Sequence, residues 1–329
     1  MNDILTMNDA QALTLIQAQA FRVNQTVYEA KFPDWNYGRW VFVDTTGPAW
    51  SPGILTYTSS ITGQAKFQSG YAKDVPMADV NQDVQTKTFH LAAIGYQWNI
   101  EEINTTLAIA GQNLPNRRAR AARLSAEKFL YDTALKGQVE KGLTGLINYT
   151  GVPTTTAPAD GTGSSTLWVD AAGVGIKTPV QIVRDINIAL QGIYLATMQI
   201  EMADTILLPV EAYNYIAATP YSAVTMDTIL SFVQRTNIYT LTTGRPLNIG
   251  TVRELGTGAA GGTTGRMVAY KNDQDYVKFH LPMPFQFLDA YRDGPLNYSV
   301  PGIFRTGGVE LLTTAAFRYI DGISQPPTP

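Results

Sequence analysis

Cysteine is absent from the sequence, and histidine occurs only twice, at His90 and His280. Without cysteine the chain forms no disulfide, has no thiolate nucleophile and cannot hold a metal through sulfur. A serine–histidine–aspartate triad would need one of the two histidines as its base, yet both lie in stretches that read as strands. Two isolated histidines also fit none of the common zinc-binding spacings. These absences predict that the chain has no catalytic residues and no metal site.

Long apolar runs are lacking as well. No stretch of about 18 apolar residues occurs, so the sequence predicts no membrane span. Residues 1–30 are polar and mixed, without the cationic start and apolar centre of a signal peptide. We therefore expect synthesis in a cytoplasm and no membrane partner.

Charged side chains are scarce. They make up 16% of the 329 residues, against roughly 25% in an average soluble domain, and the formal net charge is -3. A dedicated nucleic-acid binder usually shows a strong basic excess, which is missing here. So few charges on a long soluble chain suggest that much of its surface is covered, and another copy of the chain could cover it.

One glycine-rich motif matches the pattern of a dinucleotide-binding loop, Gly256-Thr257-Gly258-Ala259-Ala260-Gly261. Such a loop binds a cofactor only when a helix follows, because the helix N-terminus holds the pyrophosphate. Here more glycine and threonine follow, and then a strand, so we interpret the segment as a flexible hairpin loop. With no Gly-Lys-Ser/Thr sequence and only scattered acidic residues, the chain is expected to bind no cofactor and to be no enzyme.

The first hundred residues read as an arm followed by an extended β region. Residues 9–29 have weak apolar periodicity typical of a polar helix that lies on another surface. Residues 39–98 are rich in β-branched and aromatic residues, above all at 40–43 and 54–61, and Thr62-Gly63-Gln64 reads as a hairpin tip or bend. A weakly apolar β region of this kind needs a neighbour to pair with.

The rest of the chain is predicted to be mixed α and β. Asn99 can cap a short helix over 99–110, with Glu102 completing the capping pattern. Pro115 begins a long helix that ends near Leu135. The expected helices are 115–135, 178–197, 211–218 and 226–234, and the expected strands are 205–208, 247–255, 266–270, 276–281, 285–288 and 308–320. Residues 151–166 read as a surface loop.

Four arginines on the long helix form the one basic cluster: Arg117, Arg118, Arg120 and Arg123. We interpret them as a solvated face or as partners in salt bridges between subunits. The alternative is non-specific contact with phosphates through these point charges. The aromatic residues expected for stacking on single strands are missing there.

Two blocks resemble a known family. The first is Tyr96-Gln97-Trp98-Asn99-Ile100-Glu101-Glu102-Ile103-Asn104, then Asn113-Leu114-Pro115, Arg120-Ala121-Ala122-Arg123-Leu124-Ser125-Ala126-Glu127 and Gly142-Leu143-Thr144-Gly145-Leu146-Ile147-Asn148. The second runs from Arg305-Thr306-Gly307-Gly308-Val309-Glu310 to Phe317-Arg318-Tyr319-Ile320-Asp321-Gly322-Ile323. Their order resembles the peripheral domain of tailed-bacteriophage major capsid proteins, the Hong Kong 97-type fold. Encapsulin shell proteins share this pattern.

The resemblance implies an α+β subunit that assembles with itself as pentamers and hexamers in a closed icosahedral shell. It implies an N-terminal arm (1–37), an extended β-hairpin or E-loop (38–90), a peripheral domain (91–167 and 273–329) with a spine helix at 115–135, and an axial domain (168–272). It also implies location in the virion, synthesis in a bacterial host, and scaffold, portal and possible decoration proteins as partners. Contact with the packaged double-stranded DNA is expected to be non-specific.

The sequence also departs from the family pattern. The long N-terminal scaffold segment of some members is missing, which implies either a separate scaffold or a mature form. Lys66 and Lys73 lie in the hairpin region, but no partner asparagine or catalytic glutamate is matched, so we expect no covalent cross-links and no ladder on denaturing gels. The alternatives are an encapsulin-type nanocompartment that encloses a cargo enzyme, and a soluble hydrolase or binding protein of mixed α/β type.

Overall fold

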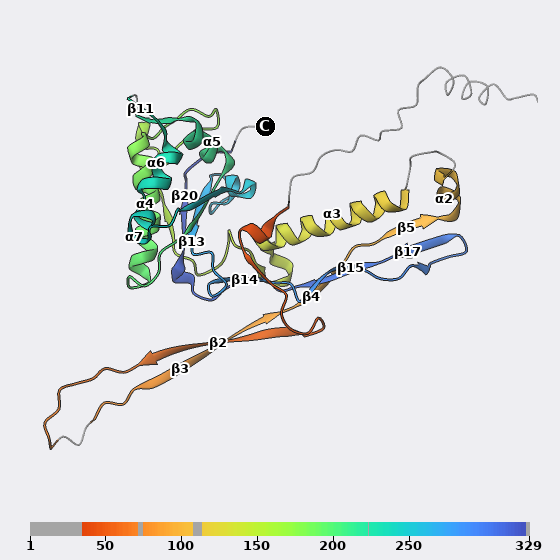
Figure 1. Cartoon of the computed structure of the whole chain (residues 1–329), viewed down its shortest axis with the longest axis horizontal. Coiled ribbons are helices and arrows are strands. Elements are labelled where there is room, and N and C mark those ends of the chain that lie inside the picture. The colour runs from red at the N-terminus through yellow and green to blue at the C-terminus, as the bar shows by residue number, and fades with distance from the viewer. Residues whose placement is uncertain (1–34, 72–74, 108–113, 223, 327–329) are drawn as a thin grey trace, which may run out of the picture. The chain divides into compact units, whose positions relative to one another are not determined.

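The computed structural model describes residues 35–71, 75–107, 114–222 and 224–326. The helix predicted over 9–29 lies outside these residues, and so does the arm predicted over 1–37 except for its last three residues. The chain divides into two compact units (Figure 1). The smaller unit contains Ile94–Ser125 and Phe287–Gly302, and the larger contains Asn36–Ala93, Ala126–Gln286 and the chain from Ile303 onward.

A five-stranded sheet forms the centre of the larger unit. Its order is β12 (Asn248–Thr251), β9 (Thr205–Leu208), β13 (Arg266–Tyr270), β20 (Phe317–Asp321) and β8 (Thr154–Thr156). β12 runs parallel to β9 and β8 parallel to β20, while β13 is antiparallel to both of its neighbours. Every residue of β9 and β13 is buried, as expected for strands covered on both faces.

Four helices lie against this sheet (Figure 1): α4 (Pro179–Ala196), α5 (Val210–Ala218), α6 (Ile229–Thr236) and α7 (Ile238–Thr243). Their buried side chains form one core with Ile206 and Ala269, which lie opposite each other on one face of the sheet. Helix α4 begins where predicted, because the Gln181 side chain accepts a hydrogen bond from the Thr178 amide at 2.8 Å and proline occupies the first helical position. Its buried face repeats at helical spacing through Ile182, Ile186, Ala189, Leu190 and Ile193. This face packs in the same apolar core as Trp168.

A buried ion cluster joins α4 to the segment before it. The Lys177 ammonium lies 2.6 Å from Asp185 and 3.3 Å from Asp160, and both side chains of the Lys177–Asp185 pair are 0% exposed. Trp168 Nε1 donates to the same Asp185 carboxylate at 3.0 Å, and Arg184 Nη2 donates to its other oxygen at 2.9 Å. Asp185 is therefore the acceptor on which three donors of this core depend.

Three predictions for this region were partly wrong. The helix expected over 226–234 begins only at Ile229, because residues Thr225–Thr228 form strand β11, which pairs with β10 (Pro220–Ser222), and the Thr228 side chain then caps α6. The strand expected over 247–255 ends at Thr251 and is followed by a 3-10 helix, Arg253–Thr257. The loop expected over 151–166 contains edge strand β8.

The strand expected over 308–320 is two strands that belong to different sheets. β19 (Gly308–Leu311) ends before a 3-10 turn, Thr314–Ala316, and β20 follows. β19 pairs with β14 (Val277–His280), which in turn pairs in parallel with β1 (Phe42–Asp44). Because the chain changes direction at this turn, β19 and β20 can pair in two different sheets, which one straight strand could not do.

A further three-stranded sheet, which lies in the larger unit apart from Phe287 and Gly302, has the order β15 (Met283–Phe287), β18 (Gly302–Thr306) and β4 (His90–Ala93). The spine helix α3 (Leu114–Leu135) matches its predicted bounds. Within the larger unit its inward face is buried at Ala126, Leu130 and Thr133, and Phe129 packs edge-on against Phe304 at 5.6 Å. These buried positions recur at helical spacing, as expected for a helix that packs one face on a core.

The end of α3 is followed by β6 (Gly137–Gln138), a 3-10 turn (Val139–Lys141) and β7 (Leu143–Thr144), and β7 lies within the segment Gly142-Leu143-Thr144-Gly145-Leu146. Gly137 has a φ of +74°, which favours glycine. The amides of Leu146 and Ile147 donate to the last carbonyls of the helix at 2.9 and 3.0 Å. Gly145 lies so close that a Cβ there would be 2.1 Å from the Leu135 carbonyl oxygen.

Substitution of Gly145 by alanine is therefore expected to destabilise the chain by about 1–3 kcal/mol, the usual effect of forcing a group into packed surroundings. Gly70→Ala is the control, because nothing lies within 4 Å of the Cβ it would add. The midpoint of thermal unfolding measures both. Equal midpoints for the two variants would contradict the close packing at Gly145.

The smaller unit contains the sheet β16 (Tyr291–Arg292), β17 (Asn297–Val300) and β5 (Tyr96–Asn99), helix α2 (Ile100–Leu107) and the first half of α3. The Trp98 and Tyr298 rings, on neighbouring strands, stack at 6.0 Å. In the part of the chain that the structure describes, none of the helices combines the length and the apolar character needed to cross a membrane.

Candidate assembly surfaces

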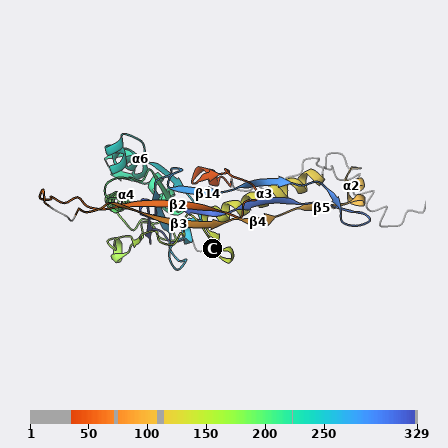
Figure 2. The same ribbon diagram turned by 90° about the horizontal axis from the view of Figure 1, so that it is seen from below.

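A long two-stranded hairpin of the larger unit is largely exposed. β2 (Gly53–Thr62) and β3 (Asp79–Thr88) lie side by side as an antiparallel ribbon (Figures 1 and 2). Ten residue pairs join them, from Gly53 opposite Thr88 to Thr62 opposite Asp79. The predicted strand at 54–61 is confirmed. The predicted turn at Thr62-Gly63-Gln64 is too short, because pairing resumes only at Asp79.

The two faces of this hairpin differ in chemistry. Residues directly opposite each other in a ladder share a face, so Tyr57 lies beside Val84, and Ile61 beside Val80. With Leu55 these residues form what we call the apolar hairpin face, in which the polar pair Ser59 and Gln82 lies between Tyr57 and Ile61. Tyr57 is 67% and Ile61 84% exposed. The opposite face is polar and carries Thr56, Thr58, Ser60, Asn81, Asp83 and Gln85.

An exposed apolar face on two strands is unusual for a soluble chain. A two-stranded ribbon is only marginally stable by itself in water, and a contiguous exposed apolar surface marks an interaction site. The segment that joins the strands adds further exposed apolar side chains, at Phe67, Tyr71, Val75 and Met77. The hairpin is therefore a candidate interaction surface.

The base of the hairpin contacts a buried acid–histidine cluster. His280 Nε2 lies 2.8 Å from Glu310 Oε2, and its Nδ1 lies 3.4 Å from Asp44 Oδ2. The Thr56 hydroxyl of β2 donates to the same Glu310 oxygen at 3.3 Å. Burial raises the pKa of the Glu310 carboxyl, but the His280 hydrogen bond and charge, with Thr56 and Lys87, outweigh it and hold that pKa below its usual value. This cluster links β19 to the hairpin.

Acid should weaken this link. Because the folded-state pKa of Glu310 lies below the ordinary value of 4.5, the carboxylate stabilises the fold fully above that pH and loses its effect as the pH falls through the folded-state pKa. Glu310→Gln removes the titrating group. We expect the variant's thermal midpoint to fall less steeply than that of the unmodified chain between about pH 5 and pH 3. Glu140→Gln, at an exposed site, is the control. Parallel curves for Glu310→Gln and the unmodified chain would contradict this role.

The other histidine and the glycine-rich loop show no arrangement of a reaction site. His90 Nε2 is paired with the Thr88 hydroxyl at 3.2 Å. The Gly256–Gly261 motif begins in the 3-10 helix Arg253–Thr257 and leads into strand β13, with no α-helix between them. Among the described residues, no group of three or more histidine, aspartate and glutamate side chains could hold a metal. That the chain has no catalytic, cofactor or metal residues stays a prediction.

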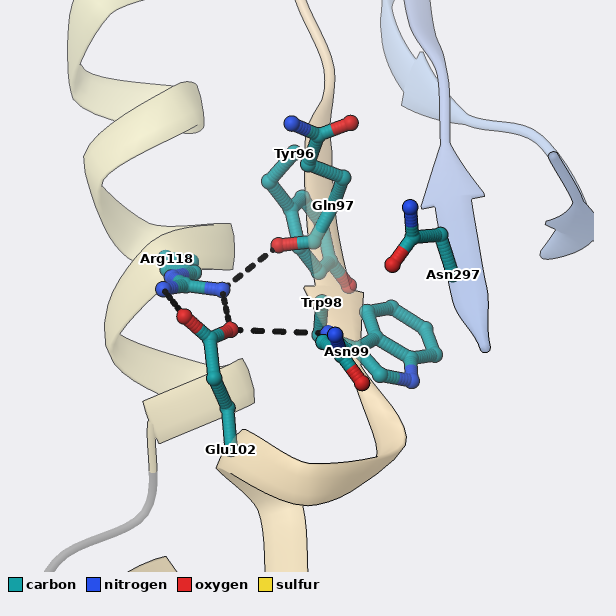
Figure 3. A pocket seen from close by; sticks show the side chains of 7 residues that line it. All are labelled: Tyr96, Gln97, Trp98, Asn99, Glu102, Arg118 and Asn297. Atoms are coloured by element: carbon teal, nitrogen blue, oxygen red, sulfur yellow. Dashed lines mark hydrogen bonds and ion pairs between the residues drawn. The ribbon is translucent and has the colours of Figure 1, made fainter. Parts of the chain in front are cut away.

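A polar hollow of about 440 Å³ lies in the smaller unit (Figure 3). Arg118, from the predicted basic cluster, is one of the residues that line this hollow. Its Nη1 donates to Glu102 Oε2 at 2.8 Å and to the Gln97 carbonyl at 2.7 Å. The hydrogen bond from Arg118 lowers the pKa of Glu102. Arg118 thus joins α3 to β5 and α2 within one chain, so its place is structural.

The predicted cap of α2 lies at the edge of this hollow. Asn99 Oδ1 accepts from the Glu101 amide at 3.1 Å, and Glu102 Oε2 accepts from the Asn99 amide at 3.4 Å. The capping prediction is confirmed. The sequence reasoning missed Arg118 as a partner of Glu102, because 16 residues and a helix boundary separate them.

Comparisons with known proteins show the family and the fold of the chain. The family described as major capsid protein matches residues 63–323. No curated protein matches the sequence. The structure of the capsid of Myoviridae phage XM1 superimposes with a TM-score of 0.76 at 15% identity, covering 93% of this chain and 98% of that one.

Two further structures share the fold. One, from Mycobacterium phage Adephagia, has a TM-score of 0.59 at 14% identity and covers 98% of this chain and 99% of that one. The other, the capsid of an empty GTA particle, has a TM-score of 0.59 at 10% identity and covers 92% of this chain and 94% of that one. At these identities the likeness to the solved structures shows the fold alone, and the match to the family model shows the family.

Proposed function

This chain belongs to the major capsid protein family, and we propose that its copies form the shell that encloses a double-stranded DNA phage genome. It is a structural shell protein of the virion with the Hong Kong 97-type α+β fold, and it assembles with itself. The soluble hydrolase or binding protein kept as an alternative is therefore wrong. We propose pentamers and hexamers as the units of an icosahedral shell.

The exposed apolar hairpin face is the observation that carries this proposal. Tyr57, Ile61 and their cross-strand partners gain stability only when a neighbour removes them from water. In a closed shell every copy offers the same surface to the next, so modest contacts multiply. We propose that the neighbour that covers this face is a second copy of the chain.

We propose that each predicted domain has its own role in the shell. Residues 1–37 act as an arm, 38–90 as the extended hairpin, 91–167 with 273–329 as the peripheral domain, and 168–272 as the axial domain around five-fold and six-fold axes. The sheet of the axial domain also takes in β8 and β20, which come from the peripheral segments. This sharing supports a stiff connection of the two domains through one sheet.

Other phage proteins and the packaged DNA are the further partners that we propose. We propose synthesis in the bacterial host cytoplasm, assembly with scaffold and portal proteins, and decoration proteins on some shells. A net charge of -3 supports weak, sequence-independent contact with the packaged DNA.

The contents of purified particles test this proposal against a nanocompartment. Neither the family match nor the structures named above favour an encapsulin-type shell. Particles from infected cells are treated with nuclease and then opened. The proposal predicts protected double-stranded DNA, and particles that contain a protein cargo and no DNA would contradict it.

A further inference from the structure

Arg305 lies at the base of the hairpin and contacts both of its legs, by which we mean the segment that leads into β2 and the segment that leaves β3. It belongs to β18 and is only 8% exposed. Its Nη1 donates to the Ala49 carbonyl at 2.9 Å, ahead of β2, and its Nη2 donates to the Phe89 carbonyl at 3.4 Å, directly after β3. The guanidinium also lies 5.7 Å from the centre of the Trp50 ring. One side chain thus joins the entry and exit of the hairpin to the sheet below.

The chemistry of arginine suits this position. A guanidinium presents several donors in a rigid planar fork, so it can hold two carbonyls at once in a fixed geometry, whereas the three donors of an ammonium rotate and do not fix that geometry. Among the described residues, no carboxylate is paired with Arg305. A nearly buried cation held by carbonyls is costly to leave without them, so the arrangement resists displacement of either leg.

Other contacts tie the two legs to each other and to the larger unit. The Phe89 amide donates to the Pro52 carbonyl at 2.9 Å, so the legs close on one another. On β2, Thr56 contacts Glu310, and on β3 the Lys87 ammonium lies 5.2 Å from the Tyr149 ring centre. The contacts of Thr56 and Lys87 each involve one strand, whereas Arg305, like the Phe89–Pro52 hydrogen bond, involves both legs.

We propose that Arg305 is the positioning residue of the assembly hairpin: it fixes the direction in which β2 and β3 leave the sheet β15–β18–β4. Direction matters because the apolar hairpin face must meet the neighbouring copy. This inference therefore rests on the proposed docking of that face. It assigns to Arg305 a role in assembly that is separate from any contact with the neighbour itself.

A distance measurement tests the positioning directly. Because the chain has no cysteine, Ser60→Cys and Glu140→Cys allow two spin labels at exposed sites of the larger unit. Their distance distribution is recorded by double electron–electron resonance on the full chain, below the concentration at which particles form. Arg305→Gln and Arg305→Lys are compared with Arg245→Gln, a control at an exposed arginine.

We expect a clearly broader distribution for both Arg305 variants and an unchanged one for the control. Lysine keeps the charge but not the fork, so it should not rescue the narrow distribution. Assembly of the variants should slow by about tenfold, the effect of one lost hydrogen bond to a charged group. Thermal unfolding checks that each variant is folded, and Arg305→Lys serves where the glutamine variant does not fold.

An unchanged distance distribution, or assembly at the unmodified rate, would overturn the inference. The failure of the docking proposal itself is seen separately, in a variant of the apolar hairpin face such as Ile61→Asp. If that variant assembles normally, docking is refuted whatever Arg305 does. If it fails to assemble while Arg305→Gln leaves the distances unchanged, docking stands and the positioning role of Arg305 falls.

Discussion

Replacement of Ile61 by aspartate is expected to abolish particle formation while leaving the subunit folded. Ile61 is 84% exposed on the apolar hairpin face, so the single subunit loses little when it becomes charged. In the shell the same carboxylate would be buried against a neighbour without a partner, which is strongly unfavourable. Sedimentation of assembly reactions measures the fraction of chain in particles.

The neighbouring residue supplies a matched control. Ser60 lies next in the strand but on the polar face, opposite Asn81, so Ser60→Asp introduces the same charge at the same distance along the hairpin. Ser60→Asp should assemble as the unmodified chain does. If both variants assemble, or both fail, the difference between the two faces does not govern assembly.

Loss of the Asp185 carboxylate is expected to produce the largest change in the stability of the larger unit. Asp185→Ala leaves the buried Lys177 ammonium without its nearest carboxylate and the Trp168 indole nitrogen without its acceptor. Removing one partner of a buried pair typically costs about 3–5 kcal/mol, because the other charge stays buried. Urea unfolding of the unassembled chain at neutral pH measures the free energy of unfolding.

An exposed ion pair of the same unit is the control. Arg235 and Asp227 lie 2.5 Å apart, with side chains 60% and 45% exposed. Asp227→Ala should therefore change the free energy of unfolding by less than about 1 kcal/mol. Similar losses in the two variants would show that burial does not set the strength of the Asp185 cluster.

Local signals explain why some elements were predictable. The bounds of α3 and α4 follow from Pro115, Pro179, the Thr178–Gln181 cap and the apolar spacing, all of which lie within a few residues of the helix. The apolar hairpin face was also readable in part. Leu55, Tyr57 and Ile61 alternate in β2, and Val80 and Val84 repeat on the partner strand.

Long-range pairing explains what was not predictable. The division of residues 308–320 into β19 and β20 depends on two different sheets, whose other strands lie far away in the sequence. The hairpin tip could not be placed at Thr62, because the register is set by pairing with Asp79 across 17 residues. The contact of Arg305 with Ala49 spans 256 residues and has no local signature.

A cryo-electron microscopy reconstruction of the assembled particle tests the central claim most directly. The account predicts a closed icosahedral shell in which a neighbouring copy covers the apolar hairpin face at Tyr57 and Ile61. A protein that stays a small, single species in solution would contradict it, and so would a closed shell whose hairpins leave that face open to water.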